Sequence, residues 1–227
     1  KPVFAVYSTF LQRAIDQLIV NNALMNLDVV FAIDRAGLVG ADGPTHHGMF
    51  DLVYTRMVPN MRVLAPSNEA ELVNSLHTAL VLGGPFAVRY PRGEACGVPV
   101  PDKPETYDPG VSRLVREGSD VAILAFGNMV EPANEAAAAL EGEGLSVRVV
   151  DMRWVKPLDI EAIRWAAETR LVVTVEDGVV AGGVGEEVLA ELARQDAKAP
   201  VLTLGIPDRY IMQGAPDFLM HEIGLDA

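Results

Sequence analysis

The sequence predicts an α/β protein with two consecutive open, mainly parallel sheets that carry helices on both faces. Short runs rich in β-branched and aromatic residues alternate with helical patterns along the chain, which is typical of stacked βα units. A proline-rich stretch from Gly93 to Gly110 interrupts the alternation and has the composition of a semi-rigid connector. The 227 residues also exceed the usual single domain of roughly 100 to 150 residues. We therefore expect one domain at residues 1–108, including a connector from about residue 93, and a second at residues 109–227.

The first domain is expected to contain four strands and two helices. We expect the strands at residues 3–7, 28–33, 61–65 and 85–90, and the helices at residues 10–22 and 69–82. The first helix has a continuous apolar face, and Ser8 or Thr9 can cap it. Asn68 and Glu71 have the spacing of a capping box at the start of the second helix.

The second domain repeats the same alternation. We expect its strands at residues 121–126, 147–150, 171–175 and 201–204, and its helices near residues 131–141, 159–169 and 184–195. The glycine-rich turn Gly182–Gly185 lacks the full dinucleotide fingerprint and a lysine, so close packing of a helix start is the better interpretation. Glu176 and Asp177 could cap that turn or lie at a subunit interface, and the sequence leaves both alternatives open.

Composition excludes several classes of partner. The formal charge of −13 opposes a nucleic-acid or anionic-membrane surface, and no apolar run approaches the roughly 18 to 20 residues that span a bilayer. Cys96 is the only cysteine, which excludes an internal disulfide and suits a reducing cytoplasm. The start Lys1–Phe4 has no initiator methionine and leads directly into a strand. We expect the chain to be a piece of a longer cytoplasmic protein.

The loop at residues 35–48 is the strongest candidate for a site. It follows the apolar run at residues 28–34, and loops beyond the carboxyl ends of parallel strands carry ligand sites in open α/β sheets. Its glycines permit backbone angles that other residues resist, while Pro44 stiffens its centre. Polar side chains in this loop can therefore be held close to a bound molecule.

His46 and two arginines are the first candidates at this edge. An imidazole can move protons near neutral pH, although His46 or His47 could instead only bond to a backbone carbonyl. Arg35 and Arg92 each follow an expected strand, so both guanidinium groups could clamp one phosphate. The alternative is a pair of surface salt bridges, which is the commoner fate of arginine in an acidic chain.

Three further residues complete the candidate site, each with a structural alternative. Asp42 could accept a hydrogen bond from a substrate hydroxyl or orient a protonated histidine, or it could form an Asx turn. Tyr7 could supply a phenolic donor at the same edge, or it could be a half-buried strand residue. Phe10 starts the first helix, where an aromatic on an apolar face usually belongs to the core.

Several longer motifs occur in one order from end to end. They are Gly40–His46, Asp51, Arg56, Pro59–Met61, Ala65–Ser67, Tyr7–Ala14, Arg89–Gly93, Val150–Asp159, Gly205–Asp208 and Gln213–Gly214. On these motifs the chain resembles the 1-deoxy-D-xylulose 5-phosphate synthases, a family of thiamine-diphosphate enzymes related to transketolase. The resemblance implies a pyrimidine-binding domain followed by a transketolase C-terminal domain.

The resemblance also implies a reaction and a role for each candidate. The family condenses pyruvate with D-glyceraldehyde 3-phosphate, with loss of CO2, to 1-deoxy-D-xylulose 5-phosphate, a precursor of isoprenoids, thiamine and pyridoxal. By the same resemblance His46 is the catalytic histidine and Phe10 stacks on the pyrimidine ring of thiamine diphosphate. The substrate-binding residues are Tyr7 and Asp42, with Arg35 and Arg92 on the phosphate. The implied assembly is a homodimer.

Parts of such an enzyme do not occur in this sequence. We find neither the Gly-Asp-Gly…Asn pattern that holds Mg2+ and the diphosphate nor a Glu-Gln-His segment with the glutamate that activates the aminopyrimidine. We expect both in a missing amino-terminal domain, so this chain alone is predicted to be inactive. The alternatives are another transketolase-like enzyme, a 2-oxo acid dehydrogenase β-type subunit, or a non-catalytic dimerisation module.

Overall fold

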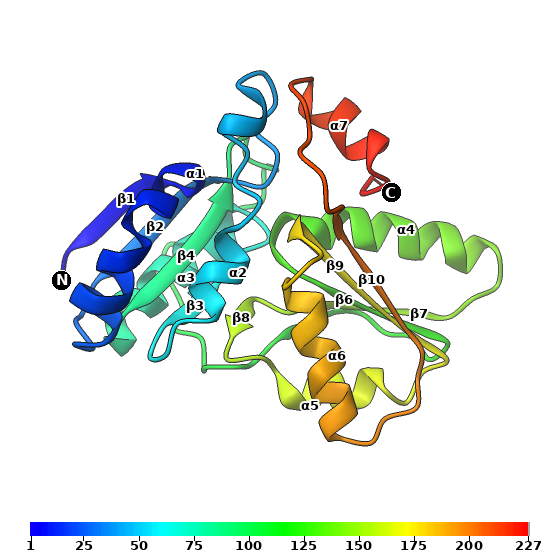
Figure 1. The fold of residues 1–227 in the computed structure, drawn as a ribbon. Helices are drawn as coiled ribbons and strands as arrows, with labels where there is room; N and C mark the ends of the chain where they lie inside the picture. Colours follow the sequence, from blue (N-terminus) through cyan, green and yellow to red (C-terminus); the bar gives the residue numbers. More distant parts are fainter. Residues whose placement is uncertain (227) are drawn as a thin grey trace.

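The computed structural model describes residues 1–226 and consists of two five-stranded, mostly parallel sheets with helices packed around them (Figure 1). The predicted α/β class is therefore confirmed. The first sheet has the order β1-β2-β4-β3-β8. Its strands are β1 (Val3–Tyr7), β2 (Val30–Ala36), β3 (Arg62–Leu64), β4 (Phe86–Pro91) and β8 (Trp154–Lys156). All neighbours are parallel except β8, which pairs antiparallel with β3.

The second sheet has the order β10-β9-β6-β7-β5, and only the edge strand β5 is antiparallel. Its strands are β5 (Arg113–Arg116), β6 (Val121–Ala125), β7 (Val147–Asp151), β9 (Leu171–Val179) and β10 (Val201–Ile206). Four of these five were expected from the sequence, and β5 was missed. The helices of this half are η4 (Gly127–Met129), α4 (Val130–Gly142), α5 (Ile160–Ala166), α6 (Val184–Arg194) and α7 (Pro216–Glu222).

The first half contains both expected helical regions, at residues 10–22 and 69–82, and two further short helices at residues 43–45 and 51–56 that were missed. They are α1 (Ser8–Leu11), η1 (Gln12–Ala14), η2 (Gln17–Ala23), η3 (Gly43–Thr45), α2 (Asp51–Arg56) and α3 (Glu69–Leu82). The expected first helix is thus a succession of α, 3-10 and π turns. Helix α3 has the predicted bounds, because the Asn68 side chain accepts a bond from the Glu71 amide at 3.0 Å and Gly83 ends the helix at φ 70°.

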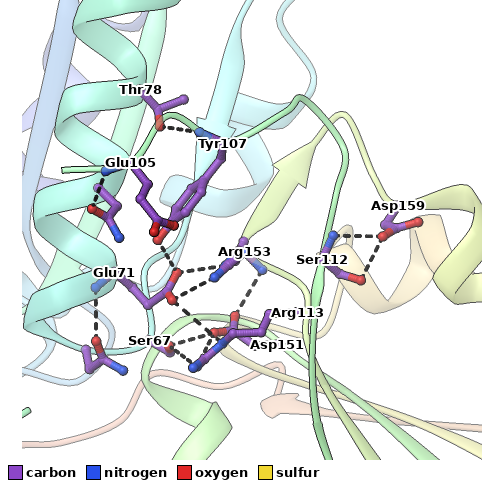
Figure 2. A network of polar contacts seen from close by, with 12 residues as sticks. Ser67, Glu71, Thr78, Glu105, Tyr107, Ser112, Arg113, Asp151, Arg153 and Asp159 are labelled. Carbon is purple, nitrogen blue, oxygen red and sulfur yellow. Dashed lines mark hydrogen bonds and ion pairs between the residues drawn. The ribbon is translucent and has the colours of Figure 1, made fainter. Parts of the chain in front are cut away.

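A polar network joins α3, the connector and the second half of the chain (Figure 2). The Glu71 carboxylate accepts two bonds of 2.8 Å from Arg153 and one of 2.7 Å from the Tyr107 hydroxyl. Asp151 accepts from Arg113 at 2.9 Å and from the Ser67 hydroxyl at 2.7 Å. Burial of Glu71 favours its neutral form, but the bonds and charge of Arg153 hold its pKa below the usual value.

This network contradicts the expected capping box, and it lies between the two halves of the chain. The capping box is only half formed, because the Glu71 carboxylate bonds to Arg153 and Tyr107 and not to the Asn68 amide. The largest apolar cluster likewise contains buried residues of both halves, such as Leu52 and Val184. None of the helices in residues 1–226 combines the length and the apolar composition that a membrane-spanning helix needs.

Candidate active site at the carboxyl edge of the first sheet

Three parallel strands end at one edge of the first sheet and bring the candidate residues there. Tyr7 is the last residue of β1, Arg35 lies near the end of β2, and Arg92 directly follows β4. Arg35 has a φ of 57°, which turns the chain out of the strand and into the loop that carries Asp42 and His46. This edge is where an open parallel sheet presents its ligand site.

An aromatic row runs along this edge. The rings of Tyr7 and Phe10 are stacked with centroids 5.3 Å apart, and the Phe10 ring meets the His46 imidazole edge-on at 5.5 Å. At the Tyr7 end of the row, the Arg35 guanidinium lies over the Tyr7 ring, with its Cζ 4.0 Å from the ring centroid. Four of the six predicted residues are therefore consecutive neighbours in space.

Asp42 connects the row to the remaining arginine. Its Oδ2 lies 3.5 Å from Nη1 of Arg35 and 4.0 Å from Nη1 of Arg92. The Arg92 side chain is 57% exposed and borders a pocket of about 390 Å3. The structure thus brings all six predicted site residues together, with two guanidinium groups near one carboxylate oxygen of Asp42.

The loop that carries Asp42 and His46 is closed at its base. Gly37 and Gly48 exchange two backbone bonds of 2.8 Å, and the Thr9 hydroxyl donates to the Thr45 carbonyl at 2.9 Å. The Thr45 hydroxyl also lies 2.9 Å from Nδ1 of His46. These bonds tie the imidazole to the start of α1, so its position depends on two elements.

Sequence reasoning missed a buried ion cluster directly beneath the loop. Arg89 donates from Nε to Asp51 at 3.0 Å and from Nη2 at 3.3 Å, and it also bonds to Asp177 of β9. All three side chains are almost fully buried. Burial alone would lower the pKa of Arg89, but the charges of Asp177 and Asp51 raise it, so Arg89 stays charged. A charged residue inside the apolar run at residues 86–90 was the signal that could have revealed this cluster.

The structure also shows the contacts of Glu176 and Asp177, whose roles the sequence left undecided. Asp177 bonds to Arg89 of the first half and lies against Gly37, where an added Cβ would come 2.5 Å from its Oδ2. Glu176 accepts a bond of 2.9 Å from the Gly185 amide at the start of α6. Burial raises the pKa of Glu176 to about 7. Within residues 1–226 no group of His, Cys, Asp and Glu side chains has the arrangement of a metal site.

Known families match both halves of the chain. Residues 1–97 match the pyrimidine-binding domain of transketolase, and residues 110–227 match the transketolase C-terminal domain. Curated relatives include the 1-deoxy-D-xylulose-5-phosphate synthases of Chlorobium luteolum, at 52% identity, and Alkalilimnicola ehrlichii, at 53%, each over the whole of this chain. The chain spans only 36% of the length of either relative.

Solved structures with the same fold include two transketolases. A split-gene transketolase described as an inactive β4 tetramer has a TM-score of 0.90 at 33% identity, and the match covers 99% of this chain and 72% of that one. The transketolase of Campylobacter jejuni has a TM-score of 0.78 at 21% identity and covers 99% of this chain and 34% of that one, which supports the fold alone.

Proposed function

The chain belongs to the transketolase family, and we propose that it is the carboxyl-terminal part of a 1-deoxy-D-xylulose-5-phosphate synthase. The complete enzyme condenses pyruvate with D-glyceraldehyde 3-phosphate, releases CO2 and forms 1-deoxy-D-xylulose 5-phosphate. The identity of about 50% to curated synthases over the whole chain supports this choice over other members of the family.

The observation that carries the proposal is the convergence of six side chains at one sheet edge. Arg35 and Arg92 each approach the same carboxylate oxygen of Asp42, at 3.5 and 4.0 Å. Two guanidinium groups at this spacing can share a phosphate through charge-assisted bonds, and the incoming phosphate would displace the long contacts to Asp42. We assign the phosphate of glyceraldehyde 3-phosphate to these arginines. Asp42 is then free to accept a bond from a substrate hydroxyl.

His46 is assigned the proton transfers at the reacting carbonyl. The Thr45 hydroxyl lies 2.9 Å from its Nδ1 and orients the ring, which leaves Nε2 as the nitrogen that donates or accepts a proton. Tyr7 lies one ring further along the same row and offers its hydroxyl to the substrate. The Tyr7 ring is also the one that lies against the Arg35 guanidinium, which would hold the acceptor.

The residues present fit thiamine diphosphate at Phe10. This ring lies in α1 (Ser8–Leu11), yet it is 37% exposed, although aromatic side chains on helices are usually core residues. Tyr7 stacks on part of it, so an aminopyrimidine would contact the part that is exposed, in an offset stack. When bound, the cofactor supplies the electron sink that permits a 2-oxo acid to lose CO2. Phe10 would hold the pyrimidine ring in place by contact with its exposed part.

The remaining parts of the enzyme are proposed to come from outside this chain. The chain spans 36% of its curated relatives, and we assign the Mg2+ ligands and the glutamate that activates the aminopyrimidine to the amino-terminal part. Exposed apolar side chains at Phe4, Leu24 and Met25 support a further contact with protein, which we propose to be a homodimer with that part in place. The free, exposed Cys96 agrees with a cytoplasmic location.

A substrate screen with the complete protein tests the proposal. The protein is supplied with thiamine diphosphate and Mg2+ and offered pyruvate or a ketose phosphate as donor, with glyceraldehyde 3-phosphate as acceptor. We expect CO2 release and 1-deoxy-D-xylulose 5-phosphate only with pyruvate. Transfer from the ketose without CO2 release identifies a transketolase instead. Absence of turnover with every donor, in a protein that still dimerises, favours the non-catalytic module.

A further inference from the structure

We propose that His47 is a positioning residue of this site. Its imidazole fastens the site loop, Gly37–Gly48, to the segment Ile211–Pro216 of the second half, and so fixes where Asp42 and His46 stand. The inference rests on the proposed function, because it assigns His47 an influence on the same reaction.

The hydrogen bonds of His47 define its state. The Val39 amide donates to Nδ1 at 3.1 Å, so Nδ1 must carry a lone pair. Nε2 then carries the proton and points at the Met212 carbonyl, 3.4 Å away. The side chain is 1% exposed, and burial lowers its pKa, in agreement with a neutral ring. His47 therefore bonds to its own loop with one nitrogen and to the second half with the other.

The loop backbone around His47 packs closely against the segment Ile211–Pro216. Gly214 donates to the Gly40 carbonyl at 3.4 Å, and a Cβ added to Gly40 would come 3.0 Å from the Gly214 carbonyl oxygen. A Cβ added to Gly43 would come 3.2 Å from Cβ of Gln213. Both loop glycines have φ above 60°. The loop and the segment therefore fit face to face, with glycine at the points of closest approach.

The connection from His47 to the reactive groups is short. The amides of His46 and His47 both bond to the Gly43 carbonyl, at 2.9 and 3.2 Å, and Asp42 is the residue before Gly43. The segment itself is anchored, since Ile211 is buried in the second apolar cluster. A shift of His47 relative to the segment would be passed directly to Asp42 and His46. In catalysis a misplacement of about 1 Å can cost two orders of magnitude in rate.

The test uses the complete protein with three substitutions at His47. His47→Leu removes both bonds, His47→Gln has an amide long enough to bond to Met212, and His47→Asn can accept from Val39 but is too short for Met212. His221→Leu is the control, because this exposed histidine hydrogen-bonds to Asp226. For each variant kcat, the KM of pyruvate and of glyceraldehyde 3-phosphate, and the melting temperature are measured.

We expect His47→Leu to lower kcat at least ten-fold with the KM of pyruvate within two-fold, and to lower the melting temperature, because the Val39 amide loses its partner. Glutamine should recover most of kcat, and the control should match the wild type. A leucine variant with kcat within two-fold of the wild type overturns the inference, as does an equal loss in the leucine and glutamine variants. If His47→Leu does not fold, His47→Gln and His47→Asn are compared instead. Equal kcat values in these two variants overturn the inference.

Failure of the proposed function gives a different result. In that case the wild type does not convert pyruvate and glyceraldehyde 3-phosphate at all. The same variants are then compared with whichever donor and acceptor the wild type accepts in the substrate screen. A positioning effect of His47 on that reaction would support the inference, and its absence would overturn it.

Discussion

The guanidinium carbon of Arg35 lies 4.0 Å from the centroid of the Tyr7 ring. The last residue of β1 therefore packs against the arginine near the end of the neighbouring strand β2. Register explains the contact, since Tyr7 pairs with Asp34, the residue before Arg35. A stacked guanidinium has fewer accessible rotamers, which lowers the entropy cost of holding a phosphate.

We expect Tyr7→Leu to weaken the acceptor site and Tyr7→Phe to preserve its geometry. Loss of a cation–π contact of about 0.5 to 2 kcal/mol corresponds to a rise in the KM of glyceraldehyde 3-phosphate of roughly 2- to 30-fold. Phenylalanine keeps the ring but loses the hydroxyl that we assign to the substrate, so the difference in KM between the Leu and Phe variants measures the ring contact with Arg35. This difference should vanish with unphosphorylated glyceraldehyde. An equal difference with both aldehydes contradicts the assigned role of Arg35.

Arg35→Ala and Arg92→Ala should each remove about half of the phosphate recognition. Charge-assisted hydrogen bonds contribute about 1.5 to 3 kcal/mol, so kcat/KM for glyceraldehyde 3-phosphate should fall roughly 10- to 150-fold in each variant. Arg164→Ala, an exposed arginine paired with Glu161 on α5, is the matched control. Steady-state kinetics of the complete protein give the answer, and a loss confined to the KM of pyruvate would point to a different ligand.

Replacement of Arg89 should destabilise the protein. Arg89→Met leaves Asp51 and Asp177 as neighbouring buried acids without a cation, and breaking a buried pair in this way costs about 3 to 5 kcal/mol. Urea unfolding of the complete protein should therefore show a clearly lower midpoint, whereas Arg164→Met should leave it unchanged. Equal midpoints for the two variants would show that the cluster adds no net stability.

Glu176 should make the protein less stable as the pH rises. Its folded pKa of about 7 lies above the ordinary value of 4.5, so the folded state binds the proton more tightly. This stability is fully present below pH 4.5 and is lost as the pH rises through 7, by about 3 kcal/mol in total. Glu176→Gln should flatten the dependence of the unfolding free energy in this window. The exposed Glu186→Gln is the control and should keep the slope of the wild type.

This chain alone should not turn over pyruvate and glyceraldehyde 3-phosphate. We assign the Mg2+ ligands and the activating glutamate to the amino-terminal part and not to this chain, which spans 36% of its curated relatives. Addition of the amino-terminal part, as a separate polypeptide or in one chain, should restore activity. Measured product formation by the chain alone, above a no-enzyme blank, would contradict the assignment of these groups.

Local patterns were sufficient for most of the fold. Helix α3 was predicted from Glu69 to about Leu82, and Asn68 marks its start. The missed elements have no such pattern. Strand β8 has only three residues. It follows Arg153, whose φ of 53° breaks the extended backbone after β7. Helix α2 begins with Asp51, whose burial depends on Arg89 and not on its neighbours in sequence.

The candidate site could be predicted as a set of residues but not as a geometry. The strand ends at Tyr7, Arg35 and Arg92 are visible in the sequence because parallel strands share an edge. Their functional roles remain predictions. The pairing of Arg89 with Asp177 joins residues that lie 88 positions apart, and only the packing of the two halves brings them into contact. The same holds for the bond between His47 and Met212.

The antiparallel pairing of β8 with β3 has a consequence for how this architecture can be recombined. A chimaera that exchanged the second half at the proline-rich connector would also replace the outermost ribbon of the first sheet, residues 154–156, and the Lys156 that bonds to the Val58 carbonyl. A chimaera joined at the connector would therefore pair β3 of one protein with β8 of another. A successful exchange should transfer Val63 and Leu64 together with residues 154–156.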